Sequence, residues 1–373
     1  MTARAAVSLA FFVLGGCFAC IACRIPDIQR SLGMDEAQVG LALMSCAVGA
    51  LAGVAVAGGI CARNGSHKVT VWAGVGCCVC LAGLSIAWNL WVLFGVFLCY
   101  GALSGVMDVA MNTNGVAVEK QIGRPIMSSL HGMFSLGGLV WAGVGWALVK
   151  MGISVPEHFV GASVLLAGTM LWILPSMQVA IPPKDKLTPA FVLPERAVLL
   201  IGIIAFSAFL SEGAMGDWSA IYLRKVLHQS DAASTLGYFA FSLAMTTTRF
   251  GGDSVLRRFG PTATLRVSGL ITAVGLGSAL WFGIPWLTIL GFATVGLGMA
   301  TVAPIAFSVG GRMGGDNPDH AIGSIATMAY IAFLVGPSAI GFIAKSSSLR
   351  EALIVVVVLS LTIVALAGAA TER

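Results

Sequence analysis

The chain has 373 residues, of which 58% are hydrophobic and 10% are charged, and its formal net charge is +5. Soluble domains average roughly 25% charged residues, so this composition excludes an ordinary soluble fold and favours a multi-span membrane protein. The basic residues lie in short loops and are not interleaved with aromatic residues, so nucleic acid is not an expected partner.

Twelve segments are long and apolar enough to cross a bilayer, which requires about 20 predominantly apolar residues. The sequence therefore predicts an all-α integral membrane protein with twelve transmembrane helices. Basic residues are about twice as frequent in the loops on the N-terminal side, which places both termini in the cytoplasm. The predicted spans are 5–29, 37–62, 68–88, 90–118, 127–150, 157–178, 196–224, 232–252, 264–283, 285–311, 320–344 and 350–370.

A proline-containing hydrophilic stretch at 179–195 reads as a cytoplasmic linker between two six-helix bundles, 1–178 and 196–373. The two halves repeat a loop pattern of paired glycines followed by an arginine two residues before a glycine. The last glycines of the two copies, Gly65 and Gly260, are 195 residues apart (260 − 65). This pattern predicts two pseudo-symmetric bundles around a central cavity.

These loop glycines and basic residues resemble the signature of the major facilitator superfamily, which implies a transporter with that fold. The acidic residue of the signature corresponds to Ala62 in the first copy and is displaced to Asp253 in the second. In the family this loop helps to lock the cytoplasmic gate. The resemblance therefore makes gating candidates of Arg63, Arg249, Asp253 and Arg258, and an Arg249–Asp253 pair at i,i+4 is expected.

Further runs resemble the YbjJ-like bacterial inner-membrane permeases, which are distantly similar to fucose permease. That resemblance implies a proton-linked secondary transporter. The runs are Arg24-Ile25-Pro26-Asp27-Ile28, Met107-Asp108-Val109-Ala110-Met111-Asn112, Glu212-Gly213-Ala214-Met215-Gly216-Asp217-Trp218-Ser219 and Phe333-Leu334-Val335-Gly336-Pro337.

Polar residues inside the fourth predicted span give the first candidate site. A carboxylate at this depth costs roughly 2.5–3.5 kcal/mol on insertion scales, so Asp108 is a candidate for proton coupling. At 100° per residue it shares one small and polar stripe with neighbours one to three turns away. The stripe either lines a water-filled cavity or packs against another helix, and it contains Gly101, Ser104, Met111, Asn112, Gly115 and Glu119. Ser104, Asn112 and Asn114 are candidate substrate ligands.

Charged and aromatic residues in other spans extend this list. Arg24 either binds substrate through its planar guanidinium or pairs with Asp27. Glu212 is a second proton-coupling candidate, and His131 is a possible proton shuttle or a simple hydrogen-bonded side chain. On the seventh span, Ser219, Trp218 and Tyr222 are candidate substrate ligands, although the aromatic pair also suits the interfacial belt.

Nine cysteines all lie between residues 17 and 99, mostly within apolar runs, and are interpreted mainly as packing residues. Sulfur ligands favour Cu(I), so Cys17, Cys20, Met107 and Met111 form an alternative site for a soft metal. No nucleophile–base constellation, zinc motif or phosphate-binding loop occurs, so no enzyme activity and no cofactor are expected.

The sequence thus predicts a monomeric secondary active transporter of the bacterial inner membrane. It is expected to move a small polar, sugar-like solute by alternating access, coupled to protons. A multidrug or metabolite exporter and a copper importer are the alternatives.

Overall fold

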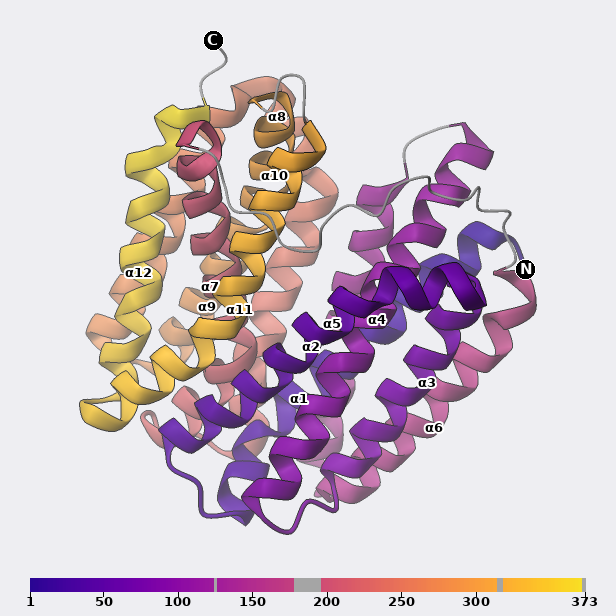
Figure 1. The fold of residues 1–373 in the computed structure, drawn as a ribbon. Coiled ribbons are helices and arrows are strands. Elements are labelled where there is room, and N and C mark those ends of the chain that lie inside the picture. The colour runs from indigo at the N-terminus through magenta and orange to yellow at the C-terminus, as the bar shows by residue number, and fades with distance from the viewer. Residues whose placement is uncertain (124–125, 178–195, 314–317, 371–373) are drawn as a thin grey trace. The chain divides into compact units, whose positions relative to one another are not determined.

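The computed structural model describes residues 1–123, 126–177, 196–313 and 318–370, although a few side chains within these ranges, including that of Asp253, are not described. The described residues form helices joined by short turns and contain no strand (Figure 1). The predicted all-α fold is therefore confirmed. The chain separates into two compact units, residues Met1–Gly33 with Ser45–Thr188, and residues Met34–Met44 with Pro189–Arg373.

In the first unit, α1 packs against α3, α4, α5 and α6 and is buried on almost every side. Small residues allow these close approaches. A Cβ atom on Gly15 would overlap the carbonyl oxygen of Phe134 on α5, so only glycine allows that helix contact. The helices of this unit are α1 (Ala3–Ser31), α2 (Glu36–Asn64), α3 (Ser66–Leu84), α4 (Leu90–Ile122), α5 (Met127–Lys150), α6 (Val155–Ile173) and the 3₁₀ turn η1 (Leu174–Ser176).

Helices α2 and α4 meet backbone to backbone through two small-residue motifs of the Gly-x-x-x-Gly type. A Cβ atom on Gly101 would overlap the carbonyl oxygen of Cys46, and one on Gly49 would overlap that of Leu98. Such motifs bring helices together in bilayers because no side chain separates the two backbones. The glycines of the α4 stripe therefore pack against another helix and do not line an open cavity.

In the second unit, α7 takes the central place and packs against α8, α9, α10, α11 and α12. Its role resembles that of α1 in the first unit, as expected for a repeated bundle. The helices are α7 (Arg196–Lys225), α8 (Asp231–Phe282), α9 (Pro285–Met299), α10 (Val302–Met313), α11 (Pro318–Ser346), α12 (Leu349–Leu366) and the 3₁₀ turn η2 (Ala367–Ala370).

Two helix boundaries differ from the sequence-based expectation. The long α8 covers both predicted spans 232–252 and 264–283, and it is broken at Gly260, whose φ of 73° is not helical. The predicted span 285–311 is instead divided between α9 and α10. Gly65, the predicted counterpart of Gly260, also has a positive φ, 82°, where α2 gives way to α3. Both repeats therefore place glycine where the backbone needs a conformation that other residues disfavour.

The first residues of α2 belong to the second unit. Asp35 forms an ion pair of 2.8 Å with Lys345, and Glu36 forms one of 2.7 Å with Lys225. Gly341 of α11 lies so close to the carbonyl oxygen of Glu36 that a Cβ atom would stand 2.5 Å from it. The predicted linker 179–195 lies outside the described residues.

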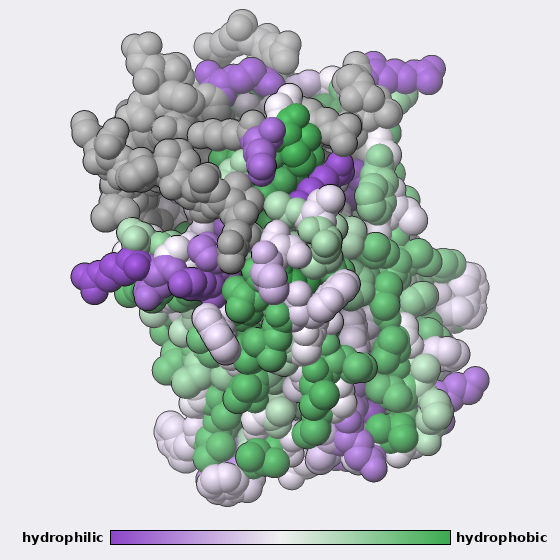
Figure 2. All heavy atoms as spheres, turned by 90° about the vertical axis from the view of Figure 1, so that its right-hand side faces the viewer, coloured by the Kyte–Doolittle hydropathy of each residue, from purple (hydrophilic) through white to green (hydrophobic). Residues whose placement is uncertain are grey.

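Eleven stretches of the described residues are long and apolar enough to cross a membrane. Figure 2 shows one face of the molecule on which hydrophobic side chains cover most of the middle and hydrophilic ones gather mainly toward the ends. Six exposed tryptophans lie on these helices or beside their ends, as in the interfacial belts of membrane proteins. They are Trp72, Trp88, Trp91, Trp172, Trp281 and Trp286.

Candidate functional site

An ion pair joins two helices of the second unit. One guanidinium nitrogen of Arg249 on α8 lies 3.3 and 3.4 Å from the two carboxylate oxygens of Glu212 on α7. Both side chains keep about a fifth of their surface exposed, 20% and 21%. The pair is thus held within the helices but remains open to a solute or to water. The expected Arg249–Asp253 pair involves a side chain outside the described ones.

Asp108 on α4 is partly exposed, and its neighbour Asn112 is hydrogen-bonded to it. The Asn112 amide nitrogen donates to the Asp108 carboxylate at 3.1 Å and to the Asp108 carbonyl oxygen at 2.8 Å. These i,i+4 bonds fix the carboxylate on the helix surface. The two residues, which are predicted to share one helix face, are therefore directly hydrogen-bonded to each other.

The other polar residues near Asp108 are engaged in packing. Asn114 is fully buried, accepts a hydrogen bond from Ser66 at 2.7 Å and donates one to Thr70 at 2.9 Å, both on α3. Ser104 is buried and donates to the carbonyl oxygen of Gly101. Asn114 and Ser104 are two of the three candidate substrate ligands of this helix, and these contacts use their polar atoms.

Glu119, at the end of the same stripe, caps the next helix. Its Oε2 accepts hydrogen bonds from the backbone nitrogens of Ile126 at 2.7 Å and Met127 at 3.1 Å. Helix N-termini leave such nitrogens without partners and favour negative charge. The stripe is therefore not one uniform wall. Its central part, at Asp108 and Asn112, is polar and partly exposed, and Glu119 is also partly exposed but is used as a cap.

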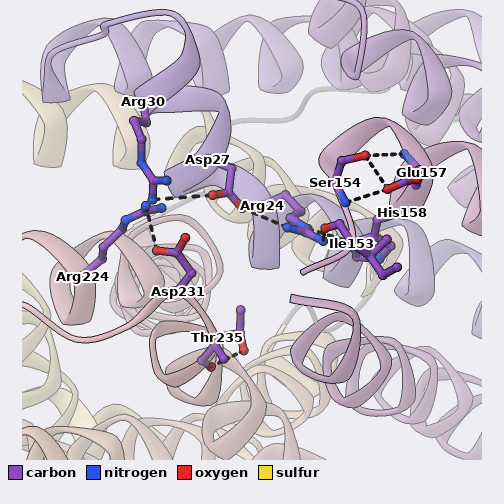
Figure 3. Close-up of polar contacts among 11 residues, drawn as sticks. Arg24, Asp27, Arg30, Ile153, Ser154, Glu157, His158, Arg224, Asp231 and Thr235 are labelled. Carbon is purple, nitrogen blue, oxygen red and sulfur yellow. Dashed lines mark hydrogen bonds and ion pairs between the residues drawn. The ribbon is translucent and has the colours of Figure 1, made fainter. Parts of the chain in front are cut away.

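Arg24 is buried in a network that uses all three of its nitrogens (Figure 3). Nε donates to Nδ1 of His158 at 3.0 Å, Nη1 to Asp27 at 3.2 Å, and Nη2 to the carbonyl oxygen of Ile153 at 2.7 Å. Only 4% of the residue is exposed. The alternative interpretation, a pair with Asp27, is the one the structure contains. Sequence reasoning missed His158, because a single histidine in an apolar span carries no distinguishing pattern.

Asp217 on α7 is partly exposed, and within the described part of the chain no hydrogen bond or ion pair engages its carboxylate. Arg224, farther along the same helix, pairs with Asp231 at 2.7 Å (Figure 3). Asp217 is thus a second partly exposed acid on the helix that carries Glu212.

The three candidate ligands beside Asp217 are inside the second unit. Trp218 and Tyr222 are both completely buried, so neither lies in the lipid-facing aromatic belt. Tyr222 packs edge to face on Phe292 of α9. Ser219 is also buried and donates to the carbonyl oxygen of Met215 on its own helix. All three therefore contribute to the packing of α7.

His131 and the remaining gating candidates lie at the surface. His131 is exposed, and its ring packs edge to face on Phe11 with a centroid separation of 5.2 Å. Arg63 is exposed near the end of α2, and Arg258 lies over the ring of Phe259 at 5.5 Å. Among the described residues Arg63 forms no hydrogen bond or ion pair.

The soft-metal candidates are buried, with Cys17, Cys20 and Met107 fully inaccessible and Met111 nearly so. The described residues contain no group of three or more histidine, cysteine or acidic side chains able to hold a metal. Cys17 does face another cysteine, since its Sγ lies 4.0 Å from that of Cys78 on α3.

An all-helical bundle with many membrane-crossing stretches and carboxylates inside them has the architecture of a membrane transporter. The family model of the Major Facilitator Superfamily matches residues 7–337. The chain belongs to the Major Facilitator Superfamily and is therefore a transporter and not an enzyme.

Relatives and solved structures agree over nearly the whole chain. An uncharacterized MFS-type transporter of Yersinia pestis is 35% identical over 98% of this chain and 94% of its own length. Membrane protein MosC of Rhizobium meliloti is 31% identical over 99% and 90%. The nucleoside transporter NupG has a TM-score of 0.75 at 16% identity, covering 99% of this chain and 98% of its own. A D-xylose-proton symporter also has a TM-score of 0.75, at 13% identity, covering 98% and 96%.

Proposed function

We propose that this transporter moves a small polar, sugar-like solute across the bacterial inner membrane and that protons drive the movement. Two bundles, 1–178 and 196–373, joined by the linker 179–195, would alternate access to the solute, with both termini in the cytoplasm. The solved neighbours include a nucleoside transporter and a sugar–proton symporter. At these identities they support the fold alone, so the proposal depends on the charges within this chain.

The observation that carries the proposal is the set of partly exposed acids on helices that are otherwise apolar. Asp108 lies on α4, and Glu212 and Asp217 lie on α7. A charged side chain within a spanning helix is costly, and such residues commonly mark proton or substrate pathways. A chain with no use for these acids would replace them with apolar residues at little loss of packing.

Glu212 is the stronger candidate for coupling because its charge state controls a defined contact. An ionised Glu212 holds Arg249 in the ion pair, whereas a protonated Glu212 loses most of that attraction. Proton binding would therefore release the Arg249 guanidinium to a different partner and bias the conformation of the second unit. Among the described residues no cation contacts Asp108, which would act through the hydrogen bond that it accepts from Asn112.

Solute recognition is assigned to the polar groups that stay accessible. The Asp217 carboxylate and the Asn112 amide are partly exposed, and each can bond a hydroxyl-bearing solute. Arg24 and Asn114 are instead assigned structural roles, because their polar atoms are used within the first unit.

Uptake by purified protein in liposomes tests this function. A thermal-shift screen with monosaccharides and nucleosides, at one acidic and one neutral pH, first identifies a bound solute. Its uptake should then rise with an inward proton gradient and collapse when a protonophore is added. Asp108→Asn and Glu212→Gln should each abolish the response to the gradient. Uptake that ignores the gradient in the wild-type protein would disprove proton coupling.

A further inference from the structure

The pair Cys17–Cys78 joins α1 and α3 in the core of the first unit. The two sulfurs are 4.0 Å apart, and both residues have no exposed surface. Two methionines bring more sulfur to this region of α3. The methyl ends of Met107 and Met170 fill the space that a Cβ atom on Gly74 would occupy, one helical turn before Cys78.

The two sulfurs lie at the distance of a thiol–thiol hydrogen bond, and this separation is closer to that of a metal-bridged pair than to that of a disulfide. A metal–thiolate bond is about 2.3 Å long, so two sulfurs on opposite sides of one ion lie about 4.6 Å apart. A disulfide needs them about 2.05 Å apart. The pair at 4.0 Å is thus about 0.6 Å from the first arrangement and about 2 Å from the second.

We propose that Cys17 and Cys78 form a two-coordinate site for a soft monovalent cation such as Cu(I) or Ag(I). Soft sulfur ligands select such ions. When the cation binds, one metal–sulfur bond replaces one sulfur–hydrogen bond, and the released proton goes to solvent. The second cysteine binds as a thiol through its sulfur lone pair.

Charge neutrality favours this stoichiometry inside the apolar bundle. One thiolate and one monovalent cation leave the occupied site uncharged, whereas two thiolates would leave a buried negative charge. A buried charge without compensation is strongly disfavoured. The site is independent of the proton-coupling proposal because it lies on helices α1 and α3 and involves none of the acids discussed above.

Silver binding tests the site, because Ag(I) shares the thiol preference of Cu(I) and does not oxidise thiols to disulfides. Purified full-length protein is saturated with silver nitrate and dialysed, and bound silver is measured by mass spectrometry. The wild-type protein should retain one more equivalent than either Cys17→Ala or Cys78→Ala. Cys99→Ser, which removes the exposed cysteine of α4, should leave that equivalent in place.

Thermal unfolding of each variant without silver shows whether it is folded. The measurement on the wild-type protein does not depend on any variant. If the wild-type protein retains no silver, the proposal is overturned. Equal retention by wild type and both alanine variants also overturns it, as does a loss that occurs only in Cys99→Ser. A wild-type protein whose two thiols disappear on mild oxidation without metal would indicate a disulfide instead, and likewise counts against it.

Discussion

Arg249 on α8 places one guanidinium nitrogen between the two carboxylate oxygens of Glu212 on α7, at 3.3 and 3.4 Å. The contact is longer than an ideal charge-assisted hydrogen bond of about 2.7–2.9 Å. It therefore holds the two helices together by charge more than by fixed geometry. An interaction of this kind depends strongly on the proton occupancy of the carboxyl group.

Glu212→Gln should disable coupling while preserving the shape of the side chain. The neutral amide cannot follow the proton, so uptake should become independent of the proton gradient. Exposed pairs contribute about 0–1 kcal/mol and buried pairs more, so the loss of stability should be about 1–2 kcal/mol. Gradient-driven uptake and the thermal midpoint in detergent measure these two effects separately.

The double variant Glu212→Gln with Arg249→Met is the control for that experiment. It removes the cation together with the acid, so much of the lost stability should return. Transport should not return with it. Recovery of gradient-driven uptake in the double variant would show that the pair is only structural.

Asn114→Ala should destabilise the contact between α3 and α4. It removes the acceptor of Ser66 and the donor to Thr70 in a fully buried position. The expected cost is about 1–3 kcal/mol, since buried polar partners remain behind. Thr113→Ala, which loses only a bond to its own helix at Val109, is the matched control and should change the thermal midpoint far less. Equal midpoints for the two variants would contradict the packing role of Asn114.

Gly101→Ala should damage the α2–α4 contact, because the new Cβ atom overlaps the carbonyl oxygen of Cys46. Overpacking of this kind costs about 1–3 kcal/mol or more. Gly95→Ala, on the same helix with nothing within 4 Å, should instead stabilise by about 0.5–1 kcal/mol. Yield of monodisperse protein and the thermal midpoint should separate the two variants in opposite directions.

Low pH should weaken the ion pair between Asp35, just before α2, and Lys345 of α11. The Lys345 ammonium holds the pKa of Asp35 below its usual range, with help from the backbone nitrogen of Gln38. A lowered pKa in the folded protein means that the stabilisation is complete above the ordinary aspartate pKa of about 3.9. It is lost as the pH falls through the lower, folded-state pKa.

Asp35→Asn should remove this pH-dependent contribution at every pH. Thermal midpoints of wild type and variant should therefore differ at neutral pH and converge in strong acid. A difference that grows as the pH falls would contradict the assignment of Asp35 to Lys345.

Much of the fold could be predicted from the sequence because a bilayer imposes simple requirements on it. Apolar stretches of sufficient length must be helical when they cross lipid, and this accounts for the predicted spans. The loop glycines Gly65 and Gly260 were predicted to be equivalent, and both have positive φ. Each pattern of glycines and arginine lies within a single loop, so it can be recognised from a short stretch of sequence.

The site was harder to predict because its partners come from different helices. Arg249 was expected to pair within its own helix, and contact with Glu212 depends on how α7 and α8 are rotated against each other. Glu119 shared a helix face with Asp108, yet it caps α5 because the chain turns back after α4. Periodicity assigns a residue to a face, but it does not say which neighbour that face meets.

The two packed units do not follow chain order alone, because one early segment joins the second unit. Residues Met34–Met44 belong with the second unit, and they supply both acids that bind Lys225 and Lys345. A fragment restricted to 196–373 would therefore lack part of its own packing surface and two counter-charges. Reconstitution from separate fragments should succeed only when the first fragment carries the start of α2. The same segment is thus the natural place to attach a probe that reports assembly.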